Sequence, residues 1–213
     1  VVLKFGGTSV GTFDAVSRTM EIIASRLPEH PVVCVSALSK VTDLLYAIAD
    51  AASCDDAEGL EARMYELRSR HLKLVCSLFS ADPEGCDRAS SKVNEICDTL
   101  AAVVSSVTAL GDVPDRIRAV IISHGELLSS TIICLALNSR GIRTGFVDAG
   151  TMIVTDSEYM CGEPQFDIIN DRVPEVVGEA FARGTAFISD GKAADGRSNE
   201  VVITQGFIAA NRQ

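Results

Sequence analysis

The sequence predicts an α/β protein of three layers, an α/β/α sandwich in which a mainly parallel β-sheet lies between helices. Short apolar runs with the length of strands alternate with longer segments whose apolar residues recur every three or four positions. Residues 1–37 contain the first strand, helix and strand of this series. Such a unit forms a parallel strand pair with a right-handed crossover, and its repetition covers both faces of the sheet with helices.

The first unit shows how each element is assigned. Residues 1–5 form an apolar run that ends at Gly6 and Gly7, which predicts a buried strand entering a turn. Thr12 is a residue type that caps helices, and a stripe of apolar residues with helical spacing follows it. The members of this stripe are Phe13, Val16, Met20, Ile23 and Leu27. Prolines then end the helix, and residues 31–37 carry the apolar run of a second strand.

Helices dominate the next part of the chain. The apolar residues of 41–52 lie on one face of a predicted helix. Two longer segments between about residues 57 and 110 show the same spacing, and Asp82 and Pro83 separate them. We expect these two segments to form a helical hairpin packed outside the sheet.

The second half of the chain returns to alternating strands and helices. Residues 116–122 fit a strand or a helix equally well, because a short apolar run carries no decisive period. Helices are predicted at 126–138 and 173–182. Strands are predicted at 144–147, 152–155, 186–189 and 201–204, with a polar loop at 190–199.

Composition and charge restrict the class of protein. The chain has 213 residues, of which 47% are hydrophobic and 23% charged, as in a globular domain. A net charge of −10 argues against a nucleic-acid-binding surface, which needs clustered Lys and Arg. No uninterrupted apolar run reaches the roughly 18 residues of a membrane helix, and the first residues are not a secretion signal. We therefore expect a cytoplasmic protein with neither a membrane nor a nucleic acid as partner.

Cysteine and histidine spacing does not indicate a metal site. The seven cysteines include no C-x-x-C pair, and their odd number argues against a disulfide framework. The three histidines lie far apart along the sequence. We expect reduced, mostly buried cysteines and no metal-binding residue in this chain.

The turn after the first predicted strand has the features of a phosphate-binding loop. Ligands of an open α/β sheet bind beyond the carboxyl ends of the strands, and Lys4 lies at such an end. Gly6 and Gly7 allow close backbone approach, and the N–H groups of Thr8 and Ser9 can join theirs around phosphate oxygens. Lys4 would add positive charge at a transferred phosphoryl group. The spacing is neither a Walker A loop nor a dinucleotide fingerprint, and a simple connecting turn is the alternative.

Three further segments bring polar or aromatic side chains to the ends of predicted elements. Ser36 and Thr42 flank the turn between the second strand and the next helix, where ordinary capping is the alternative role. Lys40 lies between them with no assigned role. Glu126 stands at the start of a predicted helix, a place where a carboxylate is favourable in any case. Phe207 follows the last predicted strand in the stretch V-I-T-Q-G-F-I-A.

Taken together, these segments resemble the aspartokinases. The stretch K-F-G-G-T-S-V at 4–10 matches the signature of that family nearly letter for letter. Residues 36–43, 123–126 and 202–209 are similar to its motifs S-A-x-x-x-x-T-[DN], S-x-G-E and V-x-x-x-G-F-I-[GA], in the same order. The resemblance covers almost the whole chain and implies the fold of the amino-acid kinase superfamily. The sequence S-H-G-E favours the monofunctional, lysine-sensitive type, and fusion to homoserine dehydrogenase stays open.

The resemblance also implies an activity and its residues. Aspartokinases transfer the γ-phosphate of ATP, used with Mg²⁺, to the β-carboxylate of L-aspartate, giving 4-phospho-L-aspartate in the diaminopimelate route to lysine, threonine and methionine. By resemblance, the ATP phosphates would be bound by Lys4, which is also the implied catalytic residue, and by Gly6, Gly7, Thr8 and Ser9. Aspartate would be bound by Ser36, Thr42, Phe207 and Glu126, the last at its α-ammonium group. The full-length enzyme would be a homo-oligomer.

Aspartokinases continue beyond these motifs with a G-R-G-G-S-D segment, an adenine-binding half and usually ACT regulatory domains. We therefore expect residues 1–213 to be the amino-acid-binding portion of a catalytic domain and to be inactive alone. Two alternatives stay open. One is another member of the superfamily, acting on glutamate, acetylglutamate or a nucleoside monophosphate, and the other is a non-catalytic module that binds a nucleotide or an amino acid.

Overall fold

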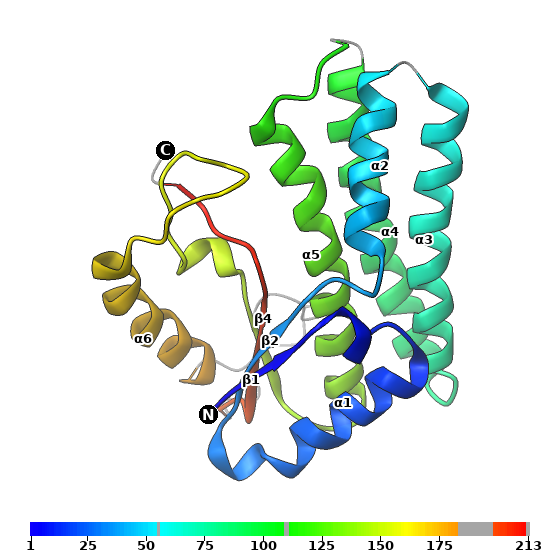
Figure 1. Ribbon diagram of the computed structural model, residues 1–213. Helices are drawn as coiled ribbons and strands as arrows, with labels where there is room; N and C mark the ends of the chain where they lie inside the picture. Colours follow the sequence, from blue (N-terminus) through cyan, green and yellow to red (C-terminus); the bar gives the residue numbers. More distant parts are fainter. Residues whose placement is uncertain (55, 109–110, 183–197, 212–213) are drawn as a thin grey trace.

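A parallel β-sheet forms the centre of the molecule. The computed structural model describes residues 1–54, 56–108, 111–182 and 198–211 (Figure 1). Its four strands pair in the order β1-β2-β4-β3, all parallel, as the predicted crossovers require. The strands are β1 (Val2–Phe5), β2 (Val32–Val35), β3 (Thr144–Val147) and β4 (Val201–Gln205).

Six α-helices within the described residues surround the sheet. They are α1 (Phe13–Ser25), α2 (Val41–Ser53), α3 (Ala57–Leu78), α4 (Pro83–Thr108), α5 (Asp115–Ser139) and α6 (Phe166–Ala182). Short 3₁₀ turns lie at η1 (Gly7–Ser9), η2 (Leu27–Glu29) and η3 (Ala149–Thr151). Thr12 caps α1 as predicted, because its Oγ1 accepts a hydrogen bond from the Ala15 N–H at 3.3 Å.

The two faces of the sheet are covered by different helices, which gives the three predicted layers. Along β4, Val201 and Ile203 belong to the main core, whereas Val202 belongs to a second cluster. Helix α5 packs on β2, β3 and β4 at the first face, and α6 packs on β3 and β4 at the second. The alternation follows from the two-residue period of a strand.

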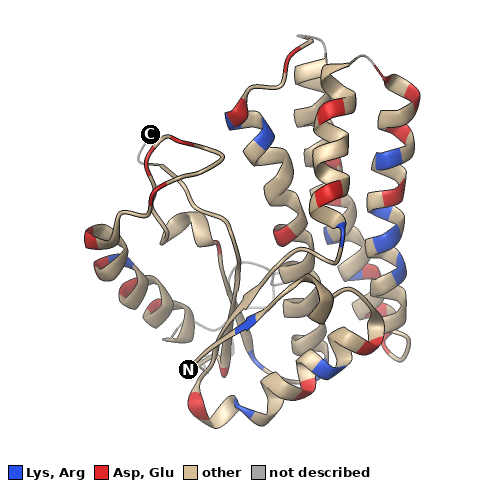
Figure 2. Ribbon diagram, viewed as in Figure 1, with Lys and Arg blue, Asp and Glu red and all other residues tan. Residues whose placement is uncertain are grey.

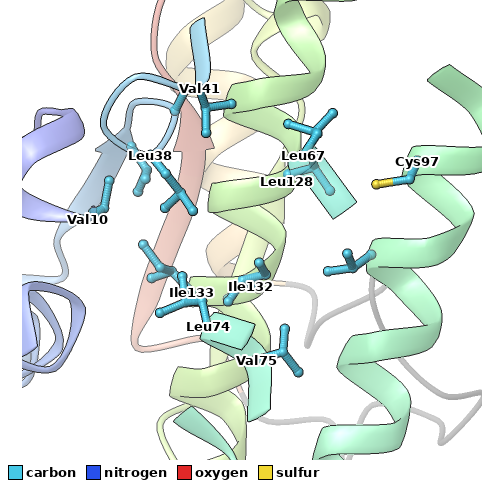
Figure 3. Packing of buried hydrophobic residues seen from close by; sticks show 14 of the residues in the cluster. Val10, Leu38, Val41, Leu67, Leu74, Val75, Cys97, Leu128, Ile132 and Ile133 are labelled. Carbon is cyan, nitrogen blue, oxygen red and sulfur yellow. The ribbon is translucent and has the colours of Figure 1, made fainter. Parts of the chain in front are cut away.

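The helices α2, α3, α4 and α5 form one layer, which we call the helical layer. Within it α3 and α4 run antiparallel beside α2 and α5, joined by a short turn (Figure 1). Leu67 of α3, Cys97 of α4 and Leu128 of α5 point into the same core (Figure 3). Acidic and basic positions are interspersed along α3 (Figure 2).

Helix α5 is long and apolar enough to cross a membrane by length and composition, although the sequence has no uninterrupted apolar run of that length. In the structure, 72% of the most apolar window of α5 is buried inside the protein. Its apolar residues contact the sheet, α2 and α4, so they form part of the protein core.

Several expectations about individual elements need correction. Residues 116–122 are helical and belong to α5, so Glu126 lies in the middle of a helix and not at its start. The predicted strand at 152–155 is absent, and only isolated bridges form there, since Val154 pairs with Ala210 beyond the end of β4. Helix α6 begins at Phe166, before the predicted start at 173. The expectations for 186–189 and for most of 190–199 fall outside the described residues.

Candidate active site

A cleft of about 620 Å³ opens at the carboxyl ends of β1, β2 and β4, within the size range of small-molecule sites. Its walls are η1, the turn between β2 and α2, the middle of α5 and the segment after β4. The lining residues are Gly7, Thr8, Ser36, Ala37, Leu38, Ser39, Lys40, Thr42, Tyr46, Ala119, Ile122, Ser123, Glu126, Tyr159, Met160 and Phe207. Residues from both ends of the sequence therefore meet at one edge of the sheet.

The glycine-rich turn after β1 packs directly against the turn after β2. A Cβ atom on Gly7 would lie 2.9 Å from the Ala37 carbonyl oxygen, which is too close. Only glycine, which has no Cβ, fits this position without a steric clash. Within η1 the Ser9 N–H donates to the Gly6 carbonyl at 2.9 Å. In the part of the chain that the structure describes, the N–H groups of Gly7 and Thr8 have no acceptor. Both residues line the cleft, so these two donors are available to an anion there.

The turn between β2 and α2 is tied to its neighbours on both sides. Ser36 N–H donates to the Phe5 carbonyl at 3.1 Å, and the Ser129 hydroxyl of α5 donates to the Ser36 carbonyl at 2.8 Å. Leu38 and Val41 of this turn point into the core beside α5 (Figure 3). The Ser36 hydroxyl is buried and has no hydrogen-bond partner among the described residues, which leaves it free for a ligand or water.

Glu126 is a buried carboxylate in the wall of the cleft. Glu126 is only 5% exposed, and its Oε1 accepts a hydrogen bond from the Ala37 N–H at 3.2 Å. Burial raises the pKa of this carboxyl, and the Ala37 N–H opposes that shift in part. No ion pair to Glu126 is present among the described residues. A positively charged ligand group would remove the cost of keeping this side chain ionised.

Gly125 allows Glu126 to reach this position. A Cβ atom on Gly125 would lie 2.9 Å from the Ala37 Cβ and 3.0 Å from Leu45 Cδ1. Helix α5 can therefore approach the β2–α2 turn only because residue 125 has no side chain. The S-x-G-E motif assigns no role of its own to this glycine. Because a helix was predicted to start at residue 126, its close packing inside α5 was not expected.

Lys4 lies beside the cleft and not among the residues that line it. The side chain is exposed on β1, and its Nζ lies 5.5 Å from the centroid of the Phe207 ring, a cation–π distance. Phe207 is 90% exposed and has a positive φ of 56°. A Cβ on Gly6 would lie at an ordinary 3.8 Å from Lys4 Nζ. Phe207 thus connects Lys4 to the cleft.

The structure brings six of the nine predicted site residues into the cleft: Gly7, Thr8, Ser36, Thr42, Glu126 and Phe207. Lys4 and Gly6 lie next to the cleft. Ser9 ends the η1 turn, where its N–H donates to the Gly6 carbonyl. One contributor was missed: the Arg70 guanidinium of α3 donates to the Ser39 carbonyl at 2.7 Å and holds the β2–α2 turn. Nothing in the local sequence of α3 distinguishes this arginine from its charged neighbours.

His124, next to Gly125 in the sequence, faces away from the cleft. It lines a separate groove with residues of α4, and its Nδ1 lies 2.7 Å from the Val120 carbonyl oxygen. Burial lowers its pKa. Among the described residues no three His, Cys, Asp or Glu side chains are grouped as a metal site would require. The seven cysteines are free thiols, but the expectation that most of them are buried is wrong: Cys97 and Cys134 are buried, whereas Cys54, Cys76 and Cys161 are exposed.

The fold and this cleft define an α/β protein with a cleft at the carboxyl edge of its parallel sheet, where ligands of such sheets usually bind. The family profile described as the amino acid kinase family matches residues 1–213, so the chain belongs to the amino acid kinase family. The chain is similar to the aspartokinase of Chlamydia muridarum, with 28% identity over 211 residues, 99% of this chain and 40% of the relative. It is also similar to the chloroplastic bifunctional aspartokinase/homoserine dehydrogenase 1 of Zea mays, with 25% identity over 194 residues, 86% of this chain and 21% of the relative.

Solved structures share the fold. Aspartokinase III of E. coli, in complex with lysine and aspartate, superposes with a TM-score of 0.78 at 20% identity, over 99% of this chain and 41% of that chain. The same protein in complex with aspartate and ADP gives a TM-score of 0.76 at 21% identity. The chain therefore has the amino-acid kinase fold, and it spans between about one fifth and two fifths of the length of these relatives.

Proposed function

We propose that this chain is the amino-acid-binding portion of an aspartate kinase, in which the β-carboxylate of L-aspartate receives the γ-phosphoryl group of ATP. The observation that carries the proposal is Glu126, a buried carboxylate without a cationic partner among the described residues, on the wall of a cleft next to a glycine-rich turn. Such a carboxylate suits the α-ammonium group of an amino acid. The similarity to aspartokinases in sequence and fold supports the same assignment.

The nucleotide would lie on the glycine-rich side of the cleft. The free N–H groups of Gly7 and Thr8 would donate to phosphate oxygens, with Gly6 and Ser9 shaping the turn. Lys4 would stabilise the charge that develops as a β-carboxylate oxygen bonds to the γ-phosphorus and the bond to ADP breaks. Phosphoryl transfer of this kind needs positioning and charge more than proton removal. ADP in a related structure agrees with the use of a nucleotide by this fold.

Aspartate would lie between Glu126 and the turn after β2. Ser36 has a buried free hydroxyl there, and Thr42 lines the cleft in the first turn of α2. The exposed ring of Phe207 would close over the ligand from the β4 side, beside Lys4. The β-carboxylate would then face the glycine-rich turn, since Glu126 holds the ammonium group.

Several finer expectations remain predictions. The described residues contain no group of carboxylates for Mg²⁺, so we assign no step to that ion within this chain. The relatives include plant proteins named as chloroplastic and bacterial proteins, and both bifunctional and single-function names. A cytoplasmic location, the monofunctional type and a homo-oligomeric assembly therefore stay predictions, as does inactivity of residues 1–213 alone.

The proposal is tested with the natural polypeptide that contains this chain, purified at its full length. ATP, Mg²⁺ and one acceptor are mixed with hydroxylamine, which traps an acyl phosphate as a hydroxamate. We expect hydroxamate with L-aspartate and at least about 100-fold less with L-glutamate or N-acetyl-L-glutamate, since one extra methylene displaces the carboxylate from the phosphoryl group. Higher activity with either of those acceptors, or with a nucleoside monophosphate in an ADP-release assay, would overturn the assignment of L-aspartate as the substrate.

A further inference from the structure

Lys40 has a backbone conformation that disfavours any side chain. Its φ is +62° and its ψ is 8°, in the left-handed region where glycine is preferred. Among the described residues, the non-glycine positions with positive φ are His30, Lys40 and Phe207, and two of these three line the cleft. Strain that persists at the wall of a binding site points to a requirement for the side chain.

Neighbouring groups hold Lys40 in this conformation. The Lys40 carbonyl accepts from the Leu44 N–H at 3.2 Å, and the Leu38 carbonyl accepts from the Val41 N–H at 2.9 Å. The Arg70 side chain fixes the preceding carbonyl of Ser39 from the other side. Because the turn is bound at three points, the direction of the Lys40 backbone does not depend on the Lys40 side chain.

The charges that line the cleft are a single cation and a single anion. Among the described residues lining it, these are Lys40 and Glu126. Lys40 is exposed, and within the described part of the chain it forms no ion pair and gives no hydrogen bond to cap α2. The N–H groups of Thr42 and Asp43 also start α2 without acceptors, which places the positive end of the helix dipole beside the ammonium group.

A second observation points to a ligand at the same turn. In the part of the chain that the structure describes, the Ser36 hydroxyl is buried without a partner, and Ser36 lines the cleft at 7% exposure. A buried hydroxyl without a partner costs free energy unless a ligand or water satisfies it. Among the described residues, this turn thus brings together an unpaired cation and two free N–H groups at the edge of the cleft, and a buried hydroxyl without a partner on a residue that lines it.

We propose that Lys40 is a substrate-binding residue that pairs with a carboxylate of the amino acid. Together with Glu126 it selects a ligand that carries both a carboxylate and an ammonium group, and the turn's free N–H groups support the same anion. This assignment rests on the proposed function and adds to it the residue that recognises the acidic character of the substrate. The sequence motifs alone assigned no role to Lys40.

Two substitutions separate the charge of Lys40 from its backbone strain. Lys40→Gly removes the ammonium group and suits a φ of +62°, whereas Lys40→Met removes the charge and keeps a side chain in the strained conformation. Lys40→Arg keeps a cation. Lys73→Met serves as the control, because Lys73 is an exposed lysine of α3 that lines no part of the cleft.

The experiment measures the Kd of L-aspartate by calorimetry, and kcat and KM by steady-state kinetics, in the natural full-length polypeptide. We expect both neutral variants to weaken L-aspartate binding about tenfold or more, with KM for ATP and kcat changed less than about threefold. Lys40→Arg should stay within about threefold of wild type, and Lys73→Met should match it. The weakening should shrink at high salt, since it is electrostatic.

Each result decides a different assignment. Equal Kd values for wild type and Lys40→Gly would overturn the Lys40 assignment and leave the proposed function intact. Loss of binding in Lys40→Arg as severe as in Lys40→Gly would also overturn it, because a charge role predicts rescue by arginine. Failure of the wild-type protein to bind L-aspartate would overturn the proposed function, and the Lys40 assignment with it.

Discussion

The helical layer and the carboxyl edge of the sheet use their residues in opposite ways. In the helical layer, large apolar side chains are packed with no exposure, among them Leu67, Leu128 and Ile132 (Figure 3). Leu45 and Leu100 are equally buried. At the sheet edge lie a buried carboxylate, Glu126, a buried hydroxyl without a partner, Ser36, and two strained residues, Lys40 and Phe207. The first region contributes stability, and the second carries features that reduce it.

This difference indicates where selection for binding outweighed selection for stability. Unpaired polar groups and left-handed side chains cost about 1–3 kcal/mol each in a folded protein. They persist when a ligand or a reaction needs them. The helical layer has one exception of its own, the buried Nε2 of His71, which also lacks a partner. The comparison therefore predicts that variants of apolar core residues in the helical layer change stability alone, and that variants of the residues lining the cleft change ligand binding or catalysis.

The largest change in stability is expected from Leu128→Ala. Leu128 is fully buried in α5 within the main core, so its truncation removes apolar contacts and leaves a cavity. We expect a loss of about 2–5 kcal/mol in the free energy of unfolding, measured by urea denaturation, with kcat and KM unchanged at a temperature where the variant is folded. A change of tenfold or more in KM for aspartate would show that this core residue also affects ligand binding, and would contradict the division of roles between the two regions.

Lys4→Met should have the largest effect on catalysis. Methionine keeps the length of the side chain and removes the charge that would stabilise the transferred phosphoryl group. We expect kcat to fall by about 100-fold or more, corresponding to about 3 kcal/mol, with an unchanged melting temperature. Lys73→Met is the matched control, since that lysine is exposed on α3. A folded Lys4→Met protein with wild-type kcat would remove Lys4 from the phosphate site.

His71 should make the helical layer sensitive to acid. Burial lowers its pKa from 6.5 to about 4, so the folded state favours the neutral ring. The stabilising contribution is complete above pH 6.5 and is lost as the pH falls towards 4, by on the order of 2–3 kcal/mol. His124 shifts in the same direction. Thermal melts between pH 4 and 8 should show a shallower acid loss for His71→Leu than for wild type.

His30→Asn is the control for replacing an exposed histidine. His30 is exposed, and asparagine tolerates its positive φ of 48°. Removal of its edge contact with the Phe181 ring should shift stability by a small amount. An acid loss in His71→Leu as steep as in wild type would assign the pH dependence to other groups, and would leave His71 as an ordinary core residue.

A smaller effect is expected where the two regions meet, at Gly125. Alanine usually stabilises a helix relative to glycine by about 1 kcal/mol. At Gly125 the added Cβ would meet Ala37 Cβ at 2.9 Å, so we expect a net loss of about 1–3 kcal/mol and weaker aspartate binding through displacement of Glu126. Gly178→Ala in α6, where nothing lies within 4 Å, should stabilise instead. If Gly125→Ala and Gly178→Ala changed the melting temperature equally, the close approach of α5 to the β2–α2 turn would not require glycine at position 125.

The elements that carry a clear period were predictable from the sequence. The stripe of α1, the run of β2 and the face of α2 follow local spacing, because their burial is set by one neighbouring layer. Helix α5 was harder, since it is buried almost all round and so has little amphipathic signal. Gly125 then gave a false boundary inside it, because the reason for that glycine is a contact with Ala37 that is remote in sequence.

The site was predictable only in part for the same reason. The family-like motifs located Gly7, Ser36 and Glu126, which do meet in one cleft. They did not locate Arg70, which acts on Ser39 from another helix, because such contacts depend on how α3 packs against the turn. The prediction of a strand at 152–155 was wrong for a similar reason. This apolar run forms only isolated bridges, one of them to a residue beyond β4, and such pairing depends on distant parts of the chain.

Glu126→Gln tests the central claim that the edge gives up stability for aspartate binding. Because burial raises the pKa of Glu126, its neutral form favours folding, and this contribution is lost as the pH rises through the raised value. Glutamine stays neutral and can still accept from the Ala37 N–H. Without ligand, the variant should therefore melt above wild type at pH 7–8, and the difference should vanish at pH values below about 4, where the carboxyl is protonated in both folded and unfolded states.

The decisive measurement is the melting temperature of wild type and Glu126→Gln at pH 7.5, each with and without saturating L-aspartate. We predict that aspartate raises the melting temperature of wild type and leaves that of the variant nearly unchanged, although the variant is the more stable protein without ligand. An equal rise in both proteins, or a variant that melts well below wild type without ligand, would contradict the account.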